Sequence, residues 1–244
     1  MHTQIKDLVK RLCPDFLFYP ALRLRSRLRS SRLINVPVAG IFADIYHDRS
    51  WGGASASGMG SDHEQTKSLR GELPQLLEAY SIGSLLDVPC GDFNWMKLVE
   101  LGGRPYIGGD IVTDLIEHNN VTFRSNNRRF CVLDIMKDRL PSADLLLCRD
   151  CLIHLSNRDV QLALKNIAHS EVSYVLTTTY PLITRNTDIV TGEFRAINLQ
   201  LAPFSLPKPV VVIPEDLFQK QKDDPNFIRE LGLWRRRDFA RWLA

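Results

Sequence analysis

The stretch Ser84-Leu85-Leu86-Asp87-Val88-Pro89-Cys90-Gly91-Asp92-Phe93 carries the pattern that decides the expected fold. Its first part, Ser84–Val88, is short and apolar, as a buried strand is. Pro89-Cys90-Gly91 indicates a turn, and we expect a helix to begin near Asp92 or Phe93. A strand, a turn and a helix in this order form the first half of a βαβ unit, in which the next strand runs parallel to the first.

The same alternation of strands and helices continues toward the C-terminus. We expect further strands at Tyr106–Ile111, Phe130–Leu133, Asp144–Cys148, Tyr174–Thr178, Pro209–Ile213 and Leu231–Arg235. Helices are expected at about 62–80, from about Thr113 and at 157–169. The last two strands have no clear helix between them, which indicates a hairpin. Together the elements predict an α/β fold: a Rossmann-like, doubly wound, mostly parallel seven-stranded sheet with a C-terminal antiparallel hairpin.

The composition is that of one globular domain preceded by a basic leader. A chain of 244 residues with 44% hydrophobic residues is long enough to bury a core of ordinary size. We expect residues 1–50 to form a basic N-terminal leader with helices, one of them at 4–12. Residues 51–244 are expected to form the ligand-binding domain, with an insertion at about 182–208.

Three further features of the sequence bear on location and partners. The five cysteines are odd in number and irregularly spaced, which favours reduced thiols. No apolar run is long enough to span a bilayer and no secretory signal is recognisable, so we expect a cytoplasmic protein. Residues 1–35 hold eight Lys and Arg against two Asp. Such a leader either packs on its own domain or contacts anionic lipid at the inner membrane, a glycan or a glycan enzyme. The net charge of +3 is too small to predict nucleic-acid binding.

Three acids follow the first three expected strands at regular spacing: Asp87, Asp110 and Asp134. In an open α/β sheet, ligands bind outside the carboxyl ends of the strands, so these carboxylates should meet at one crevice. A carboxylate after the second strand is suited to hydrogen-bond the ribose of a nucleoside. One such acid alone is often a helix cap, but three in register with a glycine turn indicate a nucleoside site.

The first turn indicates which nucleoside binds. Dinucleotide enzymes place several glycines there, so that a pyrophosphate can lie on the helix N-terminus. Here the turn has one glycine, Gly91, with Pro89 in place of an early glycine and Asp92 where a phosphate would be repelled. S-adenosylmethionine (SAM) carries a sulfonium and an ammonium group, so an acidic turn favours SAM over NAD.

Four motifs resemble those of class I SAM-dependent methyltransferases over about residues 84–180. Leu85–Phe93 resembles their first motif, Ile107–Ile111 the second and Leu133–Ile135 the third, while Asp144–Leu155 is similar to their fourth strand and its loop. Val-Pro-Cys-Gly stands where the family has a more glycine-rich loop. The resemblance implies that Gly91 lets the backbone approach the methionine part, Asp110 holds the ribose and Asp134 reaches the adenine amino group. The cofactor contacts we predict are Asp87, Pro89, Gly91, Trp95, Asp110, Ile111, Asp134, Ile135 and Arg149, with S-adenosylhomocysteine (SAH) as product.

A narrower resemblance concerns segments outside these motifs. Trp51-Gly52, Ser57–Ser61, Cys90–Trp95 and Pro203–Pro207 resemble a little-characterised bacterial methyltransferase group, some of whose members accompany glycan biosynthesis genes. It implies that a Gly/Ser loop at 52–61 folds over SAM and that 182–208 shapes the acceptor pocket. The polar side chains of 182–208, rather than an aromatic wall, suggest a hydroxyl-rich acceptor such as a sugar. Trp51, Trp95 and Tyr180 are candidates to stack on its apolar face.

The candidate catalytic residues follow the fourth strand. Methyl transfer to a hydroxyl usually needs a base, and His154 and Asp150 lie four residues apart, on one side if the stretch is helical. Alternatively, Asp150 binds SAM or local backbone, His154 is a packing residue, and positioning alone suffices. No metal is expected, because Cys148 and Cys151 have no second pair with which to complete a zinc site.

The predicted function is SAM-dependent O-methylation of a sugar or glycan intermediate. Three alternatives stay open at this point. They are a small-molecule or protein N- or O-methyltransferase, an NAD-linked oxidoreductase, which the acidic turn opposes, and a non-catalytic scaffold with the same fold.

Overall fold

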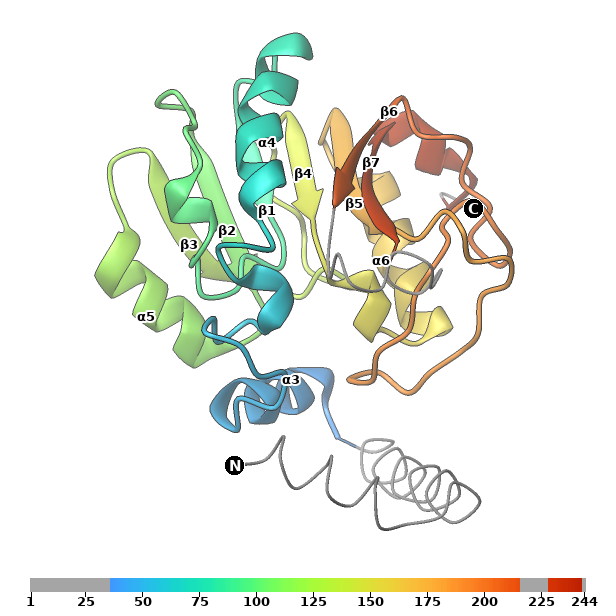
Figure 1. Cartoon of the computed structure of the whole chain (residues 1–244), viewed down its shortest axis with the longest axis horizontal. Helices are drawn as coiled ribbons and strands as arrows, with labels where there is room; N and C mark the ends of the chain where they lie inside the picture. The colour runs from blue at the N-terminus through green and yellow to red at the C-terminus, as the bar shows by residue number, and fades with distance from the viewer. Residues whose placement is uncertain (1–35, 216–227, 243–244) are drawn as a thin grey trace. The chain divides into compact units, whose positions relative to one another are not determined.

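The computed structural model describes residues 36–215 and 228–242 (Figure 1). The predicted basic leader up to residue 35, with its helix at 4–12, lies outside the described residues. Val38–Ala244 forms one compact unit. Its first helix, α3 (Val38–His47), therefore belongs with the domain rather than with a leader that ends at residue 50. Within the described ranges, no helix is both long and apolar enough to cross a bilayer.

A single mixed sheet of seven strands forms the centre of this unit, in the order β3-β2-β1-β4-β5-β7-β6. The first five strands along the chain are parallel, while β7 runs antiparallel to both β5 and β6. This confirms the predicted fold, including the C-terminal hairpin. The strands are β1 (Leu85–Asp87), β2 (Tyr106–Asp110), β3 (Arg128–Val132), β4 (Leu145–Cys148), β5 (Tyr174–Thr179), β6 (Val211–Glu215) and β7 (Arg229–Arg235).

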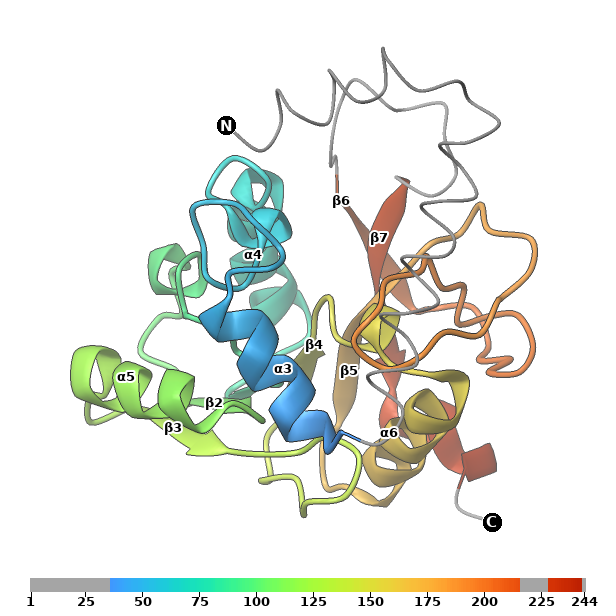
Figure 2. The ribbon, with the colours of Figure 1, turned by 90° about the horizontal axis from the view of Figure 1, so that it is seen from below.

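Helices cover both faces of the sheet. Successive side chains of a strand point to opposite faces, and β4 is buried on both. Leu145 and Leu147 pack in one apolar cluster with α4 (Lys67–Ala79) and α5 (Thr113–Phe123). Leu146 packs in the other cluster with α6 (Asn157–His169). Figure 2 shows α4 and α6 on opposite sides of the central strands.

Two helix predictions need correction. The helix expected from residue 62 begins at Lys67, because the Asp62 carboxylate accepts hydrogen bonds from the backbone N–H groups of Ala54 and Ser55, at 2.9 and 3.0 Å, and is part of the preceding loop. After β1, no α-helix begins near Asp92. Phe93 has a φ of 56°, which an α-helix does not allow, and the chain forms only the 3₁₀ helix η2 (Met96–Leu98).

The parallel strands all end at the side of the sheet over which α3 passes (Figure 2). The loop between α3 and α4 returns across the same end. Because β7 is antiparallel, its first residues lie at this end as well, next to the last residues of β5 and β6. Elements far apart in the sequence therefore meet above the sheet.

Candidate functional site

A cavity of about 330 Å³ opens at the carboxyl ends of the strands. Its wall is built from α3, the loop 51–61, the ends of β1 to β5 and the start of β7. All eleven site residues predicted from the sequence line it: Asp87, Pro89, Gly91, Trp95, Asp110, Ile111, Asp134, Ile135, Arg149, Asp150 and His154. The structure thus brings the predicted set together in one place.

Asp87 ends β1 and is almost fully buried. The hydroxyl of Tyr106 donates a hydrogen bond to its Oδ2 at 2.7 Å. Burial disfavours the charged form more than this bond and the charge of Arg149 favour it, so the pKa of Asp87 is raised to about 7. A cationic group in the cavity would restore the charged carboxylate, which makes this position suited to a ligand with an ammonium group.

Asp110, at the end of β2, is similarly buried, and burial raises its pKa to about 6. Its two oxygens accept backbone N–H groups from Gly91, at 3.2 Å, and Val112, at 3.1 Å. Asp110 therefore connects the turn after β1 to the end of β2. Asp134 accepts the N–H of Met136 at 2.9 Å and pairs with Lys137 Nζ at 3.2 Å. Three carboxylates thus line the cavity above β1, β2 and β3.

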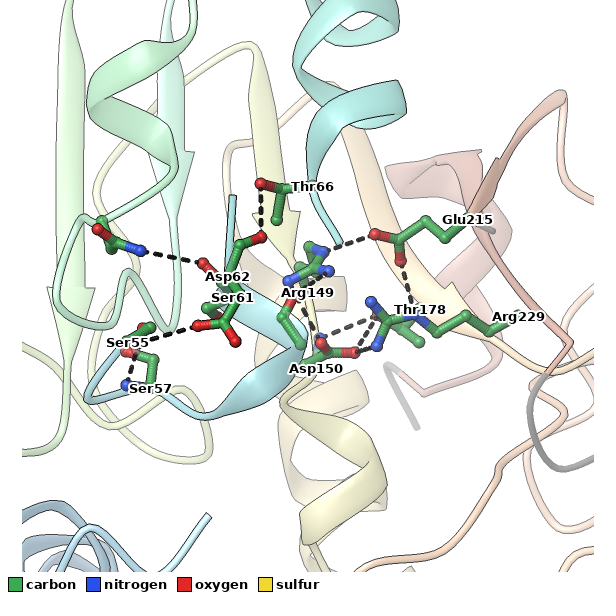
Figure 3. A network of polar contacts seen from close by, with 12 residues as sticks. Ser55, Ser57, Ser61, Asp62, Thr66, Arg149, Asp150, Thr178, Glu215 and Arg229 are labelled. Carbon is green, nitrogen blue, oxygen red and sulfur yellow. Dashed lines mark hydrogen bonds and ion pairs between the residues drawn. The ribbon is translucent and has the colours of Figure 1, made fainter. Parts of the chain in front are cut away.

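The Gly/Ser loop is attached to the turn after β1 through Asp92. This carboxylate accepts hydrogen bonds from Ser55 Oγ at 2.9 Å, from the N–H of Ala56 at 2.7 Å and from Ser57 Oγ at 3.2 Å (Figure 3 shows the two serines). Ala56 to Ser61 then line the cavity. The sequence predicts that Asp92 would repel a phosphate, but it does not indicate that this carboxylate binds the loop.

Gly91 is required by this arrangement. Its φ of 55° lies in the left-handed region, and a Cβ at this position would lie 2.2 Å from Ser57 Oγ. The turn can carry the loop only because residue 91 has no side chain.

His154 lies at the end of the 3₁₀ helix η3 (Leu152–His154) and is partly buried in the cavity wall. Its Nδ1 lies 2.9 Å from the carbonyl oxygen of Glu193, and its ring stacks on Trp51 with centroids 4.7 Å apart. A carbonyl only accepts, so Nδ1 carries the proton and Nε2 of the neutral ring keeps its lone pair. Burial lowers the pKa of His154, which favours this neutral form.

The relation predicted between Asp150 and His154 is wrong. Asp150 has a φ of 55° and does not share an α-helix with His154. Its carboxylate instead pairs with Arg229 Nη1 at 2.5 Å and Arg149 Nη1 at 3.3 Å. Burial alone would raise the pKa of Asp150, but the two guanidinium charges outweigh it and lower this pKa to about 2. A carboxylate with so low a pKa, paired with two arginines, is too weak a base to act as the general base at neutral pH.

Asp150 belongs to a buried network of two arginines and two acids (Figure 3). Arg149 Nε donates to Glu215 Oε1 at 2.8 Å, and Arg149 Nη2 donates to the carbonyl oxygen of Gly60 at 2.8 Å. Its guanidinium lies 5.5 Å from the centre of the Trp95 ring. Arg229 Nε lies 2.9 Å from Glu215 Oε2 as an ion pair. We name these four residues, Arg149, Asp150, Glu215 and Arg229, the charge network.

Sequence analysis did not single out Glu215 and Arg229. They face each other in the β6–β7 register and are almost fully buried. In the sequence, the one indication is that each of these charged residues lies two positions outside a predicted strand of the hairpin.

The insertion at 182–208 contributes to the cavity wall, but not through the polar side chains from which a sugar acceptor was predicted. Its polar side chains mostly bind backbone groups of the protein itself: Arg195 donates to the carbonyls of Thr187 and Leu152, and Asn198 to those of Pro181 and Ile183. Phe194 is the residue of this segment that lines the cavity. The other rings of the wall are Phe42, Tyr46, Trp51, Trp95 and Tyr180. An aromatic wall is therefore present. The polar side chains of 182–208 no longer support the prediction of a hydroxyl-rich acceptor, because they do not line the cavity.

No protein-family model and no curated protein matches this sequence. The fold, in contrast, is similar to that of several solved methyltransferase structures. The N-methyltransferase NodS from Bradyrhizobium japonicum WM9, in complex with SAH, has a TM-score of 0.57 at 12% identity, over 79% of this chain and 98% of that chain. Magnesium protoporphyrin IX methyltransferase from Synechocystis PCC 6803, with bound SAH, has a TM-score of 0.55 at 11% identity, over 82% and 99%.

A third similar structure contains both a methyl acceptor and the spent donor. It is the 1,6-didemethyltoxoflavin-N1-methyltransferase of Burkholderia thailandensis, with bound 1,6-didemethyltoxoflavin and SAH. Its TM-score is 0.57 at 14% identity, over 81% of this chain and 86% of that chain. At identities this low, structural similarity shows the fold alone, which is the Rossmann-like fold of SAM-dependent methyltransferases.

Proposed function

We propose that this chain is a SAM-dependent methyltransferase. The observation that carries the proposal is the set of three buried carboxylates, Asp87, Asp110 and Asp134, at successive strand ends of one cavity in a fold shared with methyltransferases. Acidic groups in a cavity with little access to water favour a cationic ligand, which SAM is and NAD is not.

Each acid suits a different part of SAM. Asp87 ends β1, next to β4, and would pair with the α-ammonium group, which would favour the charged form of this buried carboxyl. Asp110 at the end of β2 would hold the ribose hydroxyls. Asp134 at the end of β3 would reach the adenine amino group. Arg149 lines the same cavity, but each of its three side-chain nitrogens already contacts Glu215, Asp150 or the carbonyl oxygen of Gly60. We therefore assign it to holding the loop over the cofactor rather than to binding the cofactor itself.

The acceptor would react beside His154. When bound, SAM supplies an electrophilic methyl group. Nε2 of His154 is free to accept the proton of an acceptor hydroxyl while that oxygen forms its bond to the methyl carbon. The carbonyl oxygen of Glu193 keeps the proton on Nδ1, and stacking on Trp51 helps to hold the ring in place. A base in this position contributes roughly 10²–10⁴-fold to the rate.

We further propose that the acceptor carries its hydroxyl on a ring that stacks on aromatic side chains, with a sugar or glycan intermediate as the first candidate. Support comes from the rings near His154, since Trp51 and Phe194 lie 4.7 and 6.0 Å from its centroid. Such rings suit the apolar face of a sugar and suit an aromatic acceptor as well, so a small aromatic molecule is the second candidate.

Binding and transfer assays test the proposal in order. The purified protein is titrated calorimetrically with SAH, SAM and NAD, and Asp110→Ala is compared with wild type. We expect SAH to bind and Asp110→Ala to weaken it, by roughly 1.5–3 kcal/mol for each charge-assisted hydrogen bond lost. Incubation with methyl-labelled SAM and panels of sugars and phenols then identifies the acceptor. Binding of NAD in place of SAH would refute the proposal, and SAH binding without transfer to any acceptor would favour a scaffold.

A further inference from the structure

Two buried nitrogens of Arg229, Nε and Nη2, lack a hydrogen bond within the described residues, although Nε lies in an ion pair with Glu215. Arg229 is almost fully buried, and its Nη1 and Nε face Asp150 and Glu215. Its Nη2, which is shielded from solvent, makes no hydrogen bond to any residue in 36–215 or 228–242. Leaving a buried donor unpaired is costly, and most such groups in native proteins have a partner. Because Arg229 lines the cavity, a ligand is in a position to supply that partner.

The surroundings of Nη2 suit an anionic oxygen group. Tyr180 also lines the cavity, and burial raises the pKa of its hydroxyl to about 12, although the charge of Arg229 and a side-chain contact with it lower this pKa in part. The hydroxyl therefore stays protonated and can donate.

The charges of the network do not prevent an anion from binding there. Its two arginines balance Asp150 and Glu215, and each of these carboxylates faces an arginine already. An anion at Nη2 would thus meet a network with no net charge, rather than a net negative one. The buried guanidinium is held charged by the same two acids, which raise the pKa of Arg229 against the effect of burial.

The strand order indicates that this anion is not part of the cofactor. Asp87 and Asp110 end β1 and β2 and Asp134 follows β3, whereas Arg229 begins β7, which lies beyond β4 and β5 on the other side. Neighbouring strands are about 4.8 Å apart, so β7 is roughly 14 Å from β1. Tyr180 follows β5 and lies on the same side as Arg229. The acceptor, and not SAM, would occupy this side of the cavity.

We propose that Arg229 and Tyr180 bind an anionic oxygen group, a carboxylate or a phosphate, carried by the methyl acceptor. This proposal rests on the proposed methyltransferase function and narrows its substrate class. The acceptor is then an acidic molecule, with a hydroxyl that reaches His154 while its anionic group is held at the start of β7.

Matched pairs of ligands test the proposal on the full-length protein. Calorimetry measures the binding of 4-nitrophenyl β-D-glucuronide against 4-nitrophenyl β-D-glucoside, and of 4-hydroxybenzoate against 4-hydroxybenzamide, to the SAH-loaded protein. Inorganic phosphate is added as a competitor to compare the two kinds of anion. We expect the anionic member of a pair to bind at least about tenfold more tightly, as one charge-assisted contact allows.

Three variants locate the effect. Arg229→Gln should reduce the preference to roughly onefold, and Tyr180→Phe should reduce it in part. Because Arg229→Gln leaves the network with excess negative charge, Arg229→Gln combined with Glu215→Gln serves as a charge-balanced variant. It should lose the preference in the same way while keeping the circular dichroism spectrum of the wild type.

Two results would overturn the proposal. One is an equal affinity for the members of both pairs, or a preference that survives in both Arg229 variants. The other is a loss of SAH affinity in the Arg229 variants with no loss for 5′-methylthioadenosine, since Arg229 would then bind the carboxylate of the cofactor. The titrations are repeated without SAH. A protein that fails to bind SAH removes the proposed function, but it still reports whether the anions depend on Arg229.

Discussion

The affinity for SAH should depend on pH through Asp87. In the unliganded protein the pKa of this carboxyl is about 7, because burial outweighs the hydrogen bond from Tyr106. Pairing with the ammonium group of SAH requires the ionised carboxylate. Below pH 7 binding must therefore expel a proton, and the affinity should fall about tenfold for each further pH unit. Between pH 8 and pH 5 the loss is roughly a hundredfold, or about 2.7 kcal/mol.

Calorimetric titrations at pH 5, 6, 7 and 8 measure this dependence. Repeating them in two buffers of different ionisation enthalpy counts the protons released. The control ligand is 5′-methylthioadenosine, which keeps the adenine and ribose but lacks the ammonium group. Any contribution from Asp110, whose pKa is about 6, appears with both ligands. The difference between the two ligands therefore isolates Asp87.

Two variants complete the design. Asp87→Asn should remove the difference between the ligands, because an amide does not titrate in this range. Tyr106→Phe should move the loss of affinity to higher pH, because the hydroxyl bond that lowers the pKa of Asp87 is gone. The reasoning is refuted if SAH and 5′-methylthioadenosine respond to pH alike in the wild type, or if Asp87→Asn keeps the pH response of SAH.

Three further predictions concern catalysis, the loop and the leader. His154→Ala should slow methyl transfer with SAH affinity nearly unchanged. The wild-type rate should fall only at a pH below the ordinary histidine value of about 6.5, because burial lowers the pKa of His154. A wild-type rate in the variant, measured with the identified acceptor, would leave positioning as the mechanism. In urea unfolding, Gly91→Ala should destabilise the protein by about 1–3 kcal/mol, because residue 91 has a φ of 55° and its Cβ would contact Ser57. Gly71→Ala, in α4 with no atom within 4 Å of its Cβ, should stabilise the protein by up to about 1 kcal/mol. Equal effects of the two substitutions would contradict the role of residue 91. A protein that lacks residues 1–35 should keep its SAH affinity, and loss of folding on this deletion would show that the leader belongs to the core.

Local patterns in the sequence were enough to predict the sheet. Asp87 and Asp110 are the last residues of β1 and β2, and Asp134 follows β3 by two residues, as the apolar stretch before each acid indicates. All seven strands lie within a few residues of their predicted bounds. Because parallel strands end at the same edge, the three acids could also be predicted to meet.

The errors arose where tertiary contacts decide the structure. The helix expected at Asp92 is replaced by a turn, because Phe93 packs with a left-handed backbone among the rings of Tyr106 and Phe130. Nothing in the sequence near residue 92 indicates those partners. The polar residues of 182–208 were assigned to an acceptor because their own backbone partners are distant in sequence, as with Arg195 and Leu152.

Pairing between β6 and β7 determines the environment of Asp150. Its arginine partner Arg229 is 79 positions away along the chain. Their spacing predicts that Asp150 contacts His154 instead, because residues four apart often contact each other in a helix. The φ of 55° at Asp150 turns the carboxylate away from that arrangement.

The contact between Gly91 and Ser57 also constrains how this protein can diverge. A side chain at position 91 would occupy the space of the Ser57 hydroxyl, so substitutions at the two positions are not independent. Homologues that carry alanine at 91 should have glycine at 57, or should lack the acid at 92 that recruits the loop. Introducing Ser57→Gly into Gly91→Ala should recover part of the lost stability, leaving only the cost of the left-handed backbone. The turn after the first strand and the loop that covers the cavity would then be inherited as one unit.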